Sequence, residues 1–313
     1  MSVYTVVEHA QLEDFLRHYD VGRLISFQGI GAGIENTNYF VTTSTGEFVL
    51  TLFERLNYEE VLYFLELMAY LADRGVPSAH PLADQQEHYL QILNNKPAAL
   101  VERLAGQDLS KPTSSHCYAL GNALGYLHSI SPSFPYRRPN GRGPHWWKIT
   151  AEQVLPFLTQ EESSLLQEEL HFQMQHRHLD LPRGVIHGDL FRDNVLFSEE
   201  NLRGIIDFYY ACDDVLLYDV AVAVNDWCRL TESSQLDESL MHSFLEGYSQ
   251  QRKLTRLEYQ VWPVMLRAAA LRFWLSRLQD LHFPRLGEMT HIKNPDDFKD
   301  ILQAHQQRYF KVL

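Results

Sequence analysis

The chain is poor in cysteine and has no long hydrophobic run. Its three cysteines, Cys117, Cys212 and Cys228, lie too far apart for a CxxC pair or a zinc-finger pattern. An odd number of scattered cysteines predicts free thiols in a reducing compartment, not a disulfide framework. No apolar run approaches the roughly 20 residues that a helix needs to span a bilayer. We therefore expect neither a disulfide-stapled domain nor a membrane protein.

Positive charge is also scarce. The chain has 27 Lys and Arg against 40 Asp and Glu, a formal net charge of -13 at pH 7. Nucleic acids and anionic membranes attract basic surfaces, so this balance disfavours both as partners. An anionic small ligand remains compatible if backbone amides, a metal ion or a few arginines meet it locally. The start, "MSVYTVVEHAQLEDF", has neither the basic leader nor the apolar core of an export signal, which predicts a cytoplasmic location.

The first hundred residues have the pattern of strands around one helix. Ser44, Thr45 and Gly46 supply a tight turn between two β-rich segments. The helix begins after Asn57, with Glu60 placed to complete a capping box, and a glycine and a proline end it near residue 75. The predicted strands are residues 24–30, 37–43, 47–53, 88–93 and 98–104, the last two forming a hairpin. They indicate a small sheet-based lobe.

After Gly106 the pattern becomes helical. Apolar residues recur at three- and four-residue spacing over 114–129, 162–178, 236–250 and 258–281. The segment 131–147 is rich in proline and glycine, and we expect an irregular loop there. The fold class predicted is α+β and bilobal. It has a β-rich lobe (1–100), a connection (101–106) and a larger helical lobe (107–313), with a ligand site expected at the cleft between them.

One stretch carries the chemistry. "GVIHGDLFRDNVLF" (184–197) places a polar loop between two apolar runs, with Asp189 and Asn194 separated by four residues. Asp207 ends a further apolar run, "RGIIDF". Phosphoryl transfer needs a carboxylate that orients the acceptor hydroxyl and two more oxygen ligands that hold Mg²⁺ against nucleotide phosphates. These residue types in this order therefore predict a phosphotransferase.

The H-x-D-x-x-x-x-N stretch followed by a strand ending in Asp resembles the catalytic and metal-binding loops of the protein-kinase-like fold. The chain is similar to the aminoglycoside phosphotransferase/choline kinase-like superfamily over nearly its whole length. Within that superfamily it looks most like the homoserine kinase branch. The likeness depends on "GAGIENTNYFVTTSTGEFVLTLFE", "KPAALVERLAGQDL", "HGDLFRDNVLF", "IIDFYYACDDVLLYDVAVAVNDWC" and "LRAAALRFWLSRLQD".

The resemblance implies an ATP- and Mg²⁺-dependent transfer of the γ-phosphoryl group to a small amino alcohol. The favoured acceptor is L-homoserine, which would place the chain in threonine biosynthesis. Asp189 would be the catalytic base, and Asn194 and Asp207 the Mg²⁺ ligands. His187 and Asp219 would brace the catalytic loop. The residues implied in nucleotide binding are Gly31, Gly33, Asn36, Asn38, Thr51, Glu102 and Leu104.

One position departs from the family pattern. Kinases of this fold usually carry a lysine or arginine on the third strand to hold the α- and β-phosphates, and here that position is Thr51. The phosphate clamp must therefore use the Thr51 hydroxyl, magnesium and loop amides, or a basic group from elsewhere.

An acceptor with an ammonium and a carboxylate needs acidic and basic partners. The helical lobe offers Asp226 and Trp227, and Arg272 inside "LRAAALRFW", where an arginine is either a buried ion-pair partner or the carboxylate anchor. Three alternatives stay open: a kinase for choline, ethanolamine, methylthioribose or an aminoglycoside; a metal-dependent hydrolase; and a non-catalytic nucleotide-binding pseudokinase. A hydrolase would need further clustered ligands, and a pseudokinase would typically have lost Asp189 or Asp207. Nothing in the pattern predicts an oligomeric state.

Overall fold

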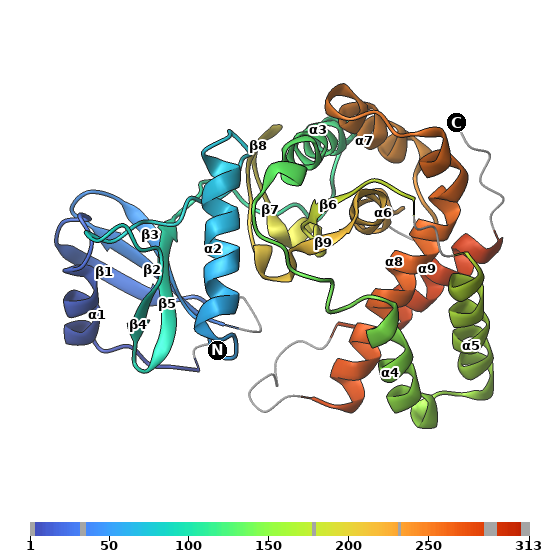
Figure 1. Ribbon diagram of the computed structural model, residues 1–313, viewed down its shortest axis with the longest axis horizontal. Coiled ribbons are helices and arrows are strands. Elements are labelled where there is room, and N and C mark those ends of the chain that lie inside the picture. Colours follow the sequence, from blue (N-terminus) through green and yellow to red (C-terminus); the bar gives the residue numbers. More distant parts are fainter. Residues whose placement is uncertain (1–3, 32–35, 177–179, 231–232, 285–292, 308–313) are drawn as a thin grey trace. The chain divides into compact units, whose positions relative to one another are not determined.

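A computed structural model describes residues 4–31, 36–176, 180–230, 233–284 and 293–307. It divides into two compact units. Among the described residues, unit 1 runs to Gly106 and also contains Arg203–Tyr209. Unit 2 contains Gln107–Leu202 and the described residues from Tyr210 onward (Figure 1). Nothing in the sequence pattern predicts that Arg203–Tyr209 belongs to unit 1.

Unit 1 is built on a five-stranded antiparallel sheet in the order β1-β2-β3-β5-β4. All five predicted strands are present, the first three within one residue of the predicted bounds, whereas β4 begins three residues later than predicted and β5 is shifted two residues toward the N-terminus. Asn94 and Asn95 form the β4–β5 turn with φ of 52° and 61°, the left-handed values that a two-residue hairpin turn requires. The strands are β1 (Leu24–Gly29), β2 (Thr37–Thr43), β3 (Glu47–Leu52), β4 (Gln91–Leu93) and β5 (Lys96–Glu102).

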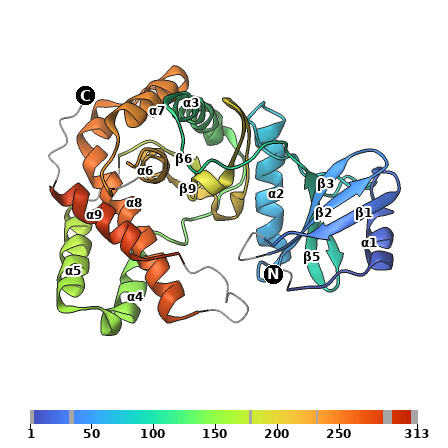
Figure 2. The same ribbon diagram turned by 180° about the vertical axis from the view of Figure 1, so that it is seen from behind.

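Two helices cover the sheet of unit 1. The helices α1 (His9–Leu16) and α2 (Tyr58–Ala72) lie on opposite faces, as the two views from front and back agree (Figures 1 and 2). The predicted capping box of α2 is confirmed, since Asn57 accepts from the Glu60 backbone N–H at 3.0 Å and Glu60 accepts from that of Asn57. The short α1 was not predicted from the sequence.

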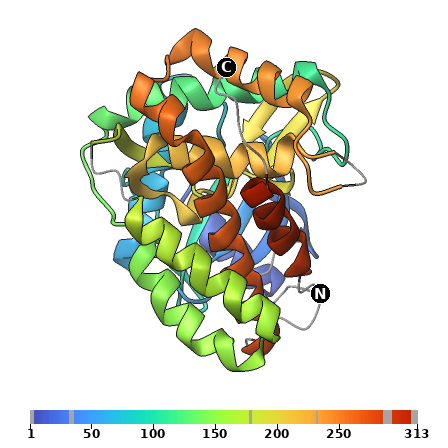
Figure 3. The same ribbon diagram turned by 90° about the vertical axis from the view of Figure 1, so that its right-hand side faces the viewer.

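Unit 2 is mainly helical around a small strand pair. The buried helix α6 lies among α3, α7, α8 and the antiparallel strands β6 and β9 (Figure 2), while α4 and α5 lie beside α8 (Figure 3). The helices are α3 (Ser114–Ile130), α4 (Pro144–Val154), α5 (Gln160–Gln175), α6 (Leu216–Trp227), α7 (Glu238–Gln251), α8 (Arg256–His282) and α9 (Asp296–Gln307). The strands are β6 (Arg183–Ile186), β7 (Val195–Ser198) and β9 (Cys212–Val215), and β8 (Asn201–Ile205) continues into unit 1.

Glycines let α3 and α7 approach closely. A Cβ atom on Gly121 would lie 2.0 Å from the Phe244 carbonyl oxygen, and one on Gly247 would lie 2.1 Å from that of Tyr118. These distances are far below van der Waals contact, so the two backbones can meet only because both positions lack a side chain. The contact therefore sets the close spacing between α3 and α7.

The expectation of an irregular loop over 131–147 is wrong at its end. Pro144 begins α4 at the first helical position, where a missing N–H costs nothing and the fixed φ suits a helix. Trp146 and Trp147 therefore lie on a helix. The three cysteines are free and buried. In the described part of the chain, no helix is both long and apolar enough to cross a membrane.

Candidate active site

The quoted polar loop leaves the sheet where β6 ends at Ile186. Gly188 makes the turn with φ of +76°, and a Cβ there would lie 3.0 Å from the Tyr210 carbonyl oxygen. Both the backbone conformation and the close neighbour require glycine at this position. The chain therefore turns sharply between His187 and Asp189, with Asp189 just outside the strand.

Asp219 on α6 holds this turn from behind. Its carboxylate is fully buried and accepts the backbone N–H groups of His187 at 2.7 Å and Gly188 at 2.8 Å. His128 on α3 donates a third hydrogen bond from Nε2 at 3.1 Å. His187 is itself buried, and its Nδ1 accepts the Asp189 backbone N–H at 3.3 Å. Four hydrogen bonds thus fix the backbone that carries Asp189.

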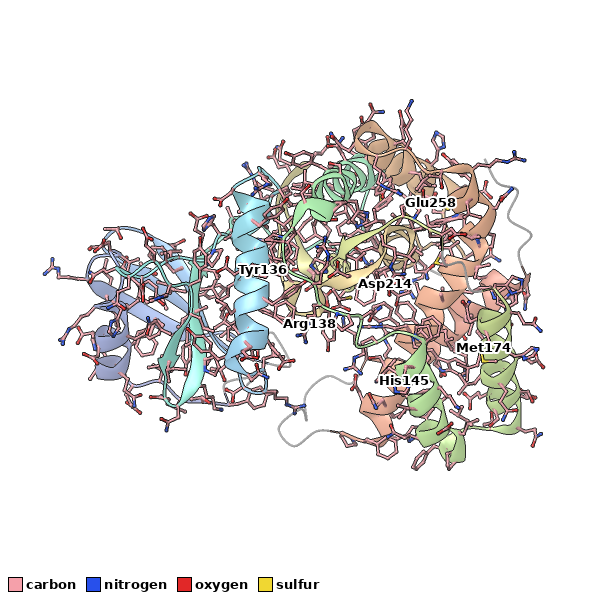
Figure 4. All side chains as sticks on the ribbon, in the orientation of Figure 1. Tyr136, Arg138, His145, Met174, Asp214 and Glu258 are labelled. Carbon is pink, nitrogen blue, oxygen red and sulfur yellow. The ribbon has the colours of Figure 1, made fainter. Side chains whose placement is uncertain are left out.

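The bracing continues away from the loop through unit 2. The Tyr248 hydroxyl donates to His128 Nδ1 at 2.9 Å and accepts from Arg252 at 2.9 Å. Arg252 then donates to Glu258, a fully buried carboxylate at the start of α8 that is labelled in Figure 4, at 2.7 Å. Burial lowers the pKa of His128, which favours the neutral ring. Burial alone would raise the pKa of Asp219, but the hydrogen bonds from His128 and Gly188 lower it on balance.

Asn194 lies against Asp189. Its Nδ2 donates to the Asp189 backbone carbonyl at 2.8 Å and to the Asp189 carboxylate at 3.2 Å. None of the hydrogen bonds of the described residues uses Asn194 Oδ1, so this oxygen is available as a ligand. Burial raises the pKa of Asp189, although the Arg272 guanidinium opposes the shift. A carboxylate in such surroundings binds a proton more readily than a solvated one.

Four further hydrogen bonds hold the middle of the loop. Arg192 donates to both carboxylate oxygens of Asp226, at 3.0 and 3.2 Å, and its backbone N–H adds a bond of 2.8 Å. The indole N–H of Trp227 donates to the Leu190 carbonyl at 3.2 Å, and its side chain is fully buried. The contacts found for Asp226 and Trp227 are thus to the loop, and their role as acceptor ligands stays a prediction. Arg192 was missed by sequence reasoning, because its partner lies 34 residues away.

The Arg272 guanidinium faces the Asp189 carboxylate. Its Nη1 lies 3.7 Å from Asp189 Oδ1, and its Cζ lies 3.7 Å from the centre of the Phe273 ring and 5.4 Å from that of Tyr210. The side chain is only 4% exposed, yet none of the hydrogen bonds within the described residues uses its five N–H donors. A buried cation with unused donors is costly unless an anion completes it. The environment of the Arg272 guanidinium therefore favours an anionic ligand beside Asp189.

Unit 1 brings together three of the residues implied in nucleotide and metal binding. Thr51 is buried and donates from its hydroxyl to Asn38 Oδ1 at 2.7 Å. The Tyr209 side chain is hydrogen bonded to Thr51, and burial and the nearby Asp207 carboxylate raise the pKa of its hydroxyl. The Tyr209 ring packs edge-on against Phe53, at 5.0 Å between ring centres. Asp207 therefore follows β8 on a segment that is anchored to the sheet, with an unusual positive φ of 62°.

The other described residues that the resemblance implies in nucleotide binding also lie in unit 1. Asn36 is buried, and Gly31 is exposed with open space around its Cα, while Gly33 lies outside the described residues. The backbone N–H of Glu102 donates to the His80 carbonyl at 3.0 Å. The N–H of Leu104 takes part in none of the hydrogen bonds found among the described residues. Leu104 therefore offers a backbone donor to a ligand.

Comparison with known proteins places these residues in context. The phosphotransferase enzyme family matches residues 26–255. A homoserine kinase from Methylobacillus flagellatus is 50% identical over 97% of this chain and 95% of its own length. One from Methylobacillus glycogenes is 46% identical over the same shares. An amicoumacin kinase solved with AMP-PNP and Ca²⁺ superposes with a TM-score of 0.73 at 16% identity, over 96% of this chain and 93% of its own. The structural match confirms the predicted fold class.

Proposed function

Because the chain belongs to the phosphotransferase enzyme family, we propose that its site transfers the γ-phosphoryl group of ATP to the hydroxyl of L-homoserine. The geometry that supports a transfer to an alcohol is the Asp189 carboxylate, held by a fully braced turn and flanked by Asn194 and Arg272. Relatives that are homoserine kinases, at up to 50% identity across 97% of the chain, support the acceptor. The product is O-phospho-L-homoserine, an intermediate of threonine biosynthesis, and we propose a cytoplasmic location.

Asp189 carries the proton chemistry. Its carboxylate accepts a hydrogen bond from the acceptor hydroxyl and orients that oxygen toward the γ-phosphorus. The new bond forms between this oxygen and the phosphorus, the bond from the phosphorus to the bridging oxygen of ADP breaks, and the proton passes to Asp189 late in the step. The raised pKa of Asp189 favours this final transfer, because a buried carboxylate takes up a proton more easily than an exposed one.

We propose that Asn194 and Asp207 would hold a magnesium ion together with the nucleotide phosphates. Asn194 leaves its amide oxygen unused in the described residues, and Asp207 supplies a carboxylate after β8. Among the described residues, no three His, Cys, Asp or Glu side chains cluster as a cage of their own. Magnesium prefers a few oxygen ligands together with substrate phosphates, so a two-ligand protein set suits it. When bound, the ion would neutralise charge that develops on the phosphates.

For the nucleotide, we propose that the glycine turn at Gly31 and Gly33 and the side chains of Asn36 and Asn38 cover the phosphates. The Thr51 hydroxyl takes the place of the usual strand cation, and its hydrogen bonds to Asn38 and Tyr209 fix its position. The backbone around Glu102 and Leu104 binds the adenine. Lacking a third-strand cation, this side of the site depends more on magnesium than a site with the usual lysine does.

An acceptor screen tests the proposed function. ADP release is measured with Mg²⁺ and ATP against L-homoserine, choline, ethanolamine, methylthioribose and kanamycin. We expect kcat/KM for L-homoserine to exceed that for every other alcohol. Activity confined to an alcohol without a carboxylate would remove L-homoserine as the acceptor, and no activity with any of them would remove the kinase assignment.

A further inference from the structure

The segment between α3 and α4 carries an arginine that the proposed reaction does not use. Arg142 lies on this segment between Arg138 and His145, which are labelled in Figure 4. Its backbone is fixed at both ends: its N–H donates to Asn140 at 2.7 Å, and its carbonyl accepts the Trp147 indole N–H at 2.7 Å. The side chain therefore starts from a rigid base.

The guanidinium of Arg142 lies over aromatic rings. Its Cζ lies 4.6 Å from the centre of the Trp146 ring and 5.9 Å from that of Tyr210. Its one hydrogen bond among the described residues runs to the Gln279 side-chain oxygen, at 3.3 Å. It forms no ion pair with a carboxylate within the described part of the chain, although acidic residues outnumber basic ones in the sequence, 40 to 27. An arginine that is held in place and has no carboxylate partner in the protein is suited to binding an anionic group of a ligand.

Tyr210 connects this arginine to the catalytic carboxylate. The guanidinium groups of Arg142 and Arg272 both lie within 6 Å of the centre of the Tyr210 ring, at 5.9 and 5.4 Å, and Arg272 also lies beside Asp189. Along α8, Arg272, Ser276 and Gln279 are spaced by four and three residues and so share one helix face. Two turns of helix place Arg272 and Gln279 about 10.5 Å apart, because each residue adds about 1.5 Å.

The length of a hydroxy amino acid is close to the separation of Arg272 and Gln279, the two α8 residues that contact Asp189 and Arg142. A four-carbon chain holds its hydroxyl and carboxylate oxygens about 5–6 Å apart when extended. A hydrogen bond of about 2.8 Å at each end raises the span between the two protein partners to about 11 Å. We propose that Arg142 binds the α-carboxylate of the acceptor while Asp189 binds its hydroxyl, with the acceptor lying along the Arg272, Ser276 and Gln279 face of α8. This inference rests on the proposed function and names its specificity residue.

Under this assignment, Arg272 and Arg142 have different roles. Arg272 lies at the reacting end, where it faces the catalytic carboxylate, and Arg142 lies at the recognition end. Losing a charge-assisted contact to the acceptor carboxylate should lower affinity about 10- to 200-fold. Because the contact exists before and during the reaction, the loss should raise KM and leave kcat within about threefold.

The experiment compares Arg142→Gln and Arg142→Lys with the wild-type chain. We measure kcat and KM for L-homoserine, its affinity by calorimetry with AMP-PNP and Mg²⁺, and the inhibition constant of 3-amino-1-propanol, which is homoserine without its carboxylate. The glutamine variant should show the KM rise and the matching loss of affinity, and the lysine variant a smaller one. The inhibition constant of 3-amino-1-propanol should stay within about threefold. Arg256→Gln, the same change at an exposed position on α8, is the control and should leave all values unchanged.

The possible outcomes distinguish a failure of this inference from a failure of the proposed function on which it rests. A wild-type chain that does not phosphorylate L-homoserine removes the proposed function. A wild-type chain that does so, with an unchanged KM in Arg142→Gln, overturns only the role of Arg142. An equal loss of affinity for L-homoserine and for 3-amino-1-propanol would likewise overturn the role of Arg142, because 3-amino-1-propanol has no carboxylate. A fall in kcat alone would also overturn it, because carboxylate binding should change KM.

Discussion

Replacing Asp219 with asparagine removes one hydrogen-bond acceptor from a site where three donors converge. The Oδ1 atom accepts from the Gly188 N–H, and Oδ2 accepts from the His187 N–H and from His128. An asparagine has one oxygen and one NH₂ group to offer these donors. His128 can adapt by exchanging tautomers, because the Tyr248 hydroxyl can donate or accept. Neither backbone N–H can adapt, so one of them loses its partner in either orientation of the amide.

The size of the effect follows from that single orphaned donor. A buried N–H left without an acceptor costs about 1–3 kcal/mol. For a unit of this size, each kcal/mol lowers Tm by about 2–4 °C, so Asp219→Asn should unfold about 2–12 °C below the wild type. The turn that carries Asp189 loses one of its anchors, and a displacement of about 1 Å can reduce kcat by about a hundredfold.

Calorimetry gives Tm, and coupled ADP release gives kcat at saturating ATP and L-homoserine. The control is Asp237→Asn, at the N-cap of α7, where the side chain accepts from Ser239 at 2.8 Å and Leu240 at 3.1 Å. Asparagine caps helices as well as aspartate does, so this variant should match the wild type. If Asp219→Asn also matched the wild type in both Tm and kcat, the reasoning about the braced turn would be refuted.

Three more predictions concern stability. Gly121→Ala should lower Tm by several degrees, because its Cβ would overlap the Phe244 backbone, whereas Gly141→Ala, with open space around it, should not; equal values would contradict the close packing. Asp189→Asn should unfold at or above the wild-type Tm, because the raised pKa shows that the fold disfavours the charged form; a clear fall would contradict this. The folded-state pKa of His128 lies below its unfolded value of 6.5, so the stability that it contributes is present above that pH and declines as pH falls through it. The Tm difference between wild type and His128→Gln should therefore shrink from pH 7.5 to 5.5, and a constant difference would refute the shift.

Much of the fold could be predicted because the turn and capping residues agree with the spacing of the apolar residues. The β4–β5 turn and the α2 capping box are set by residues within a few positions of each other, and both were predicted correctly. The start of α4 was missed because the prolines and glycines before it read as a loop, although Pro144 itself begins the helix. α1, with eight residues, is too short for a reliable period.

The chemistry-bearing loop was predictable for a different reason. Asp189 and Asn194 lie five positions apart, so their contact is local, and one motif identifies both. The partners that brace the loop come from distant helices: Asp226 meets Arg192, and His128 meets Asp219 across 91 residues. Arg142 had no sequence signal, because two of its neighbours, Tyr210 and Gln279, are brought to it by tertiary packing.

The proposed mechanism depends most directly on Asp189 as the proton acceptor of the phosphoryl transfer. The decisive measurement is the rate at which the phosphate ester of L-homoserine forms, followed by ³¹P NMR at saturating Mg²⁺ and ATP, in wild type and in Asp189→Asn. We predict that the variant forms the ester at least about a hundredfold more slowly while its affinity for the nucleotide changes little. Ester formation at the wild-type rate in Asp189→Asn would contradict the assigned role.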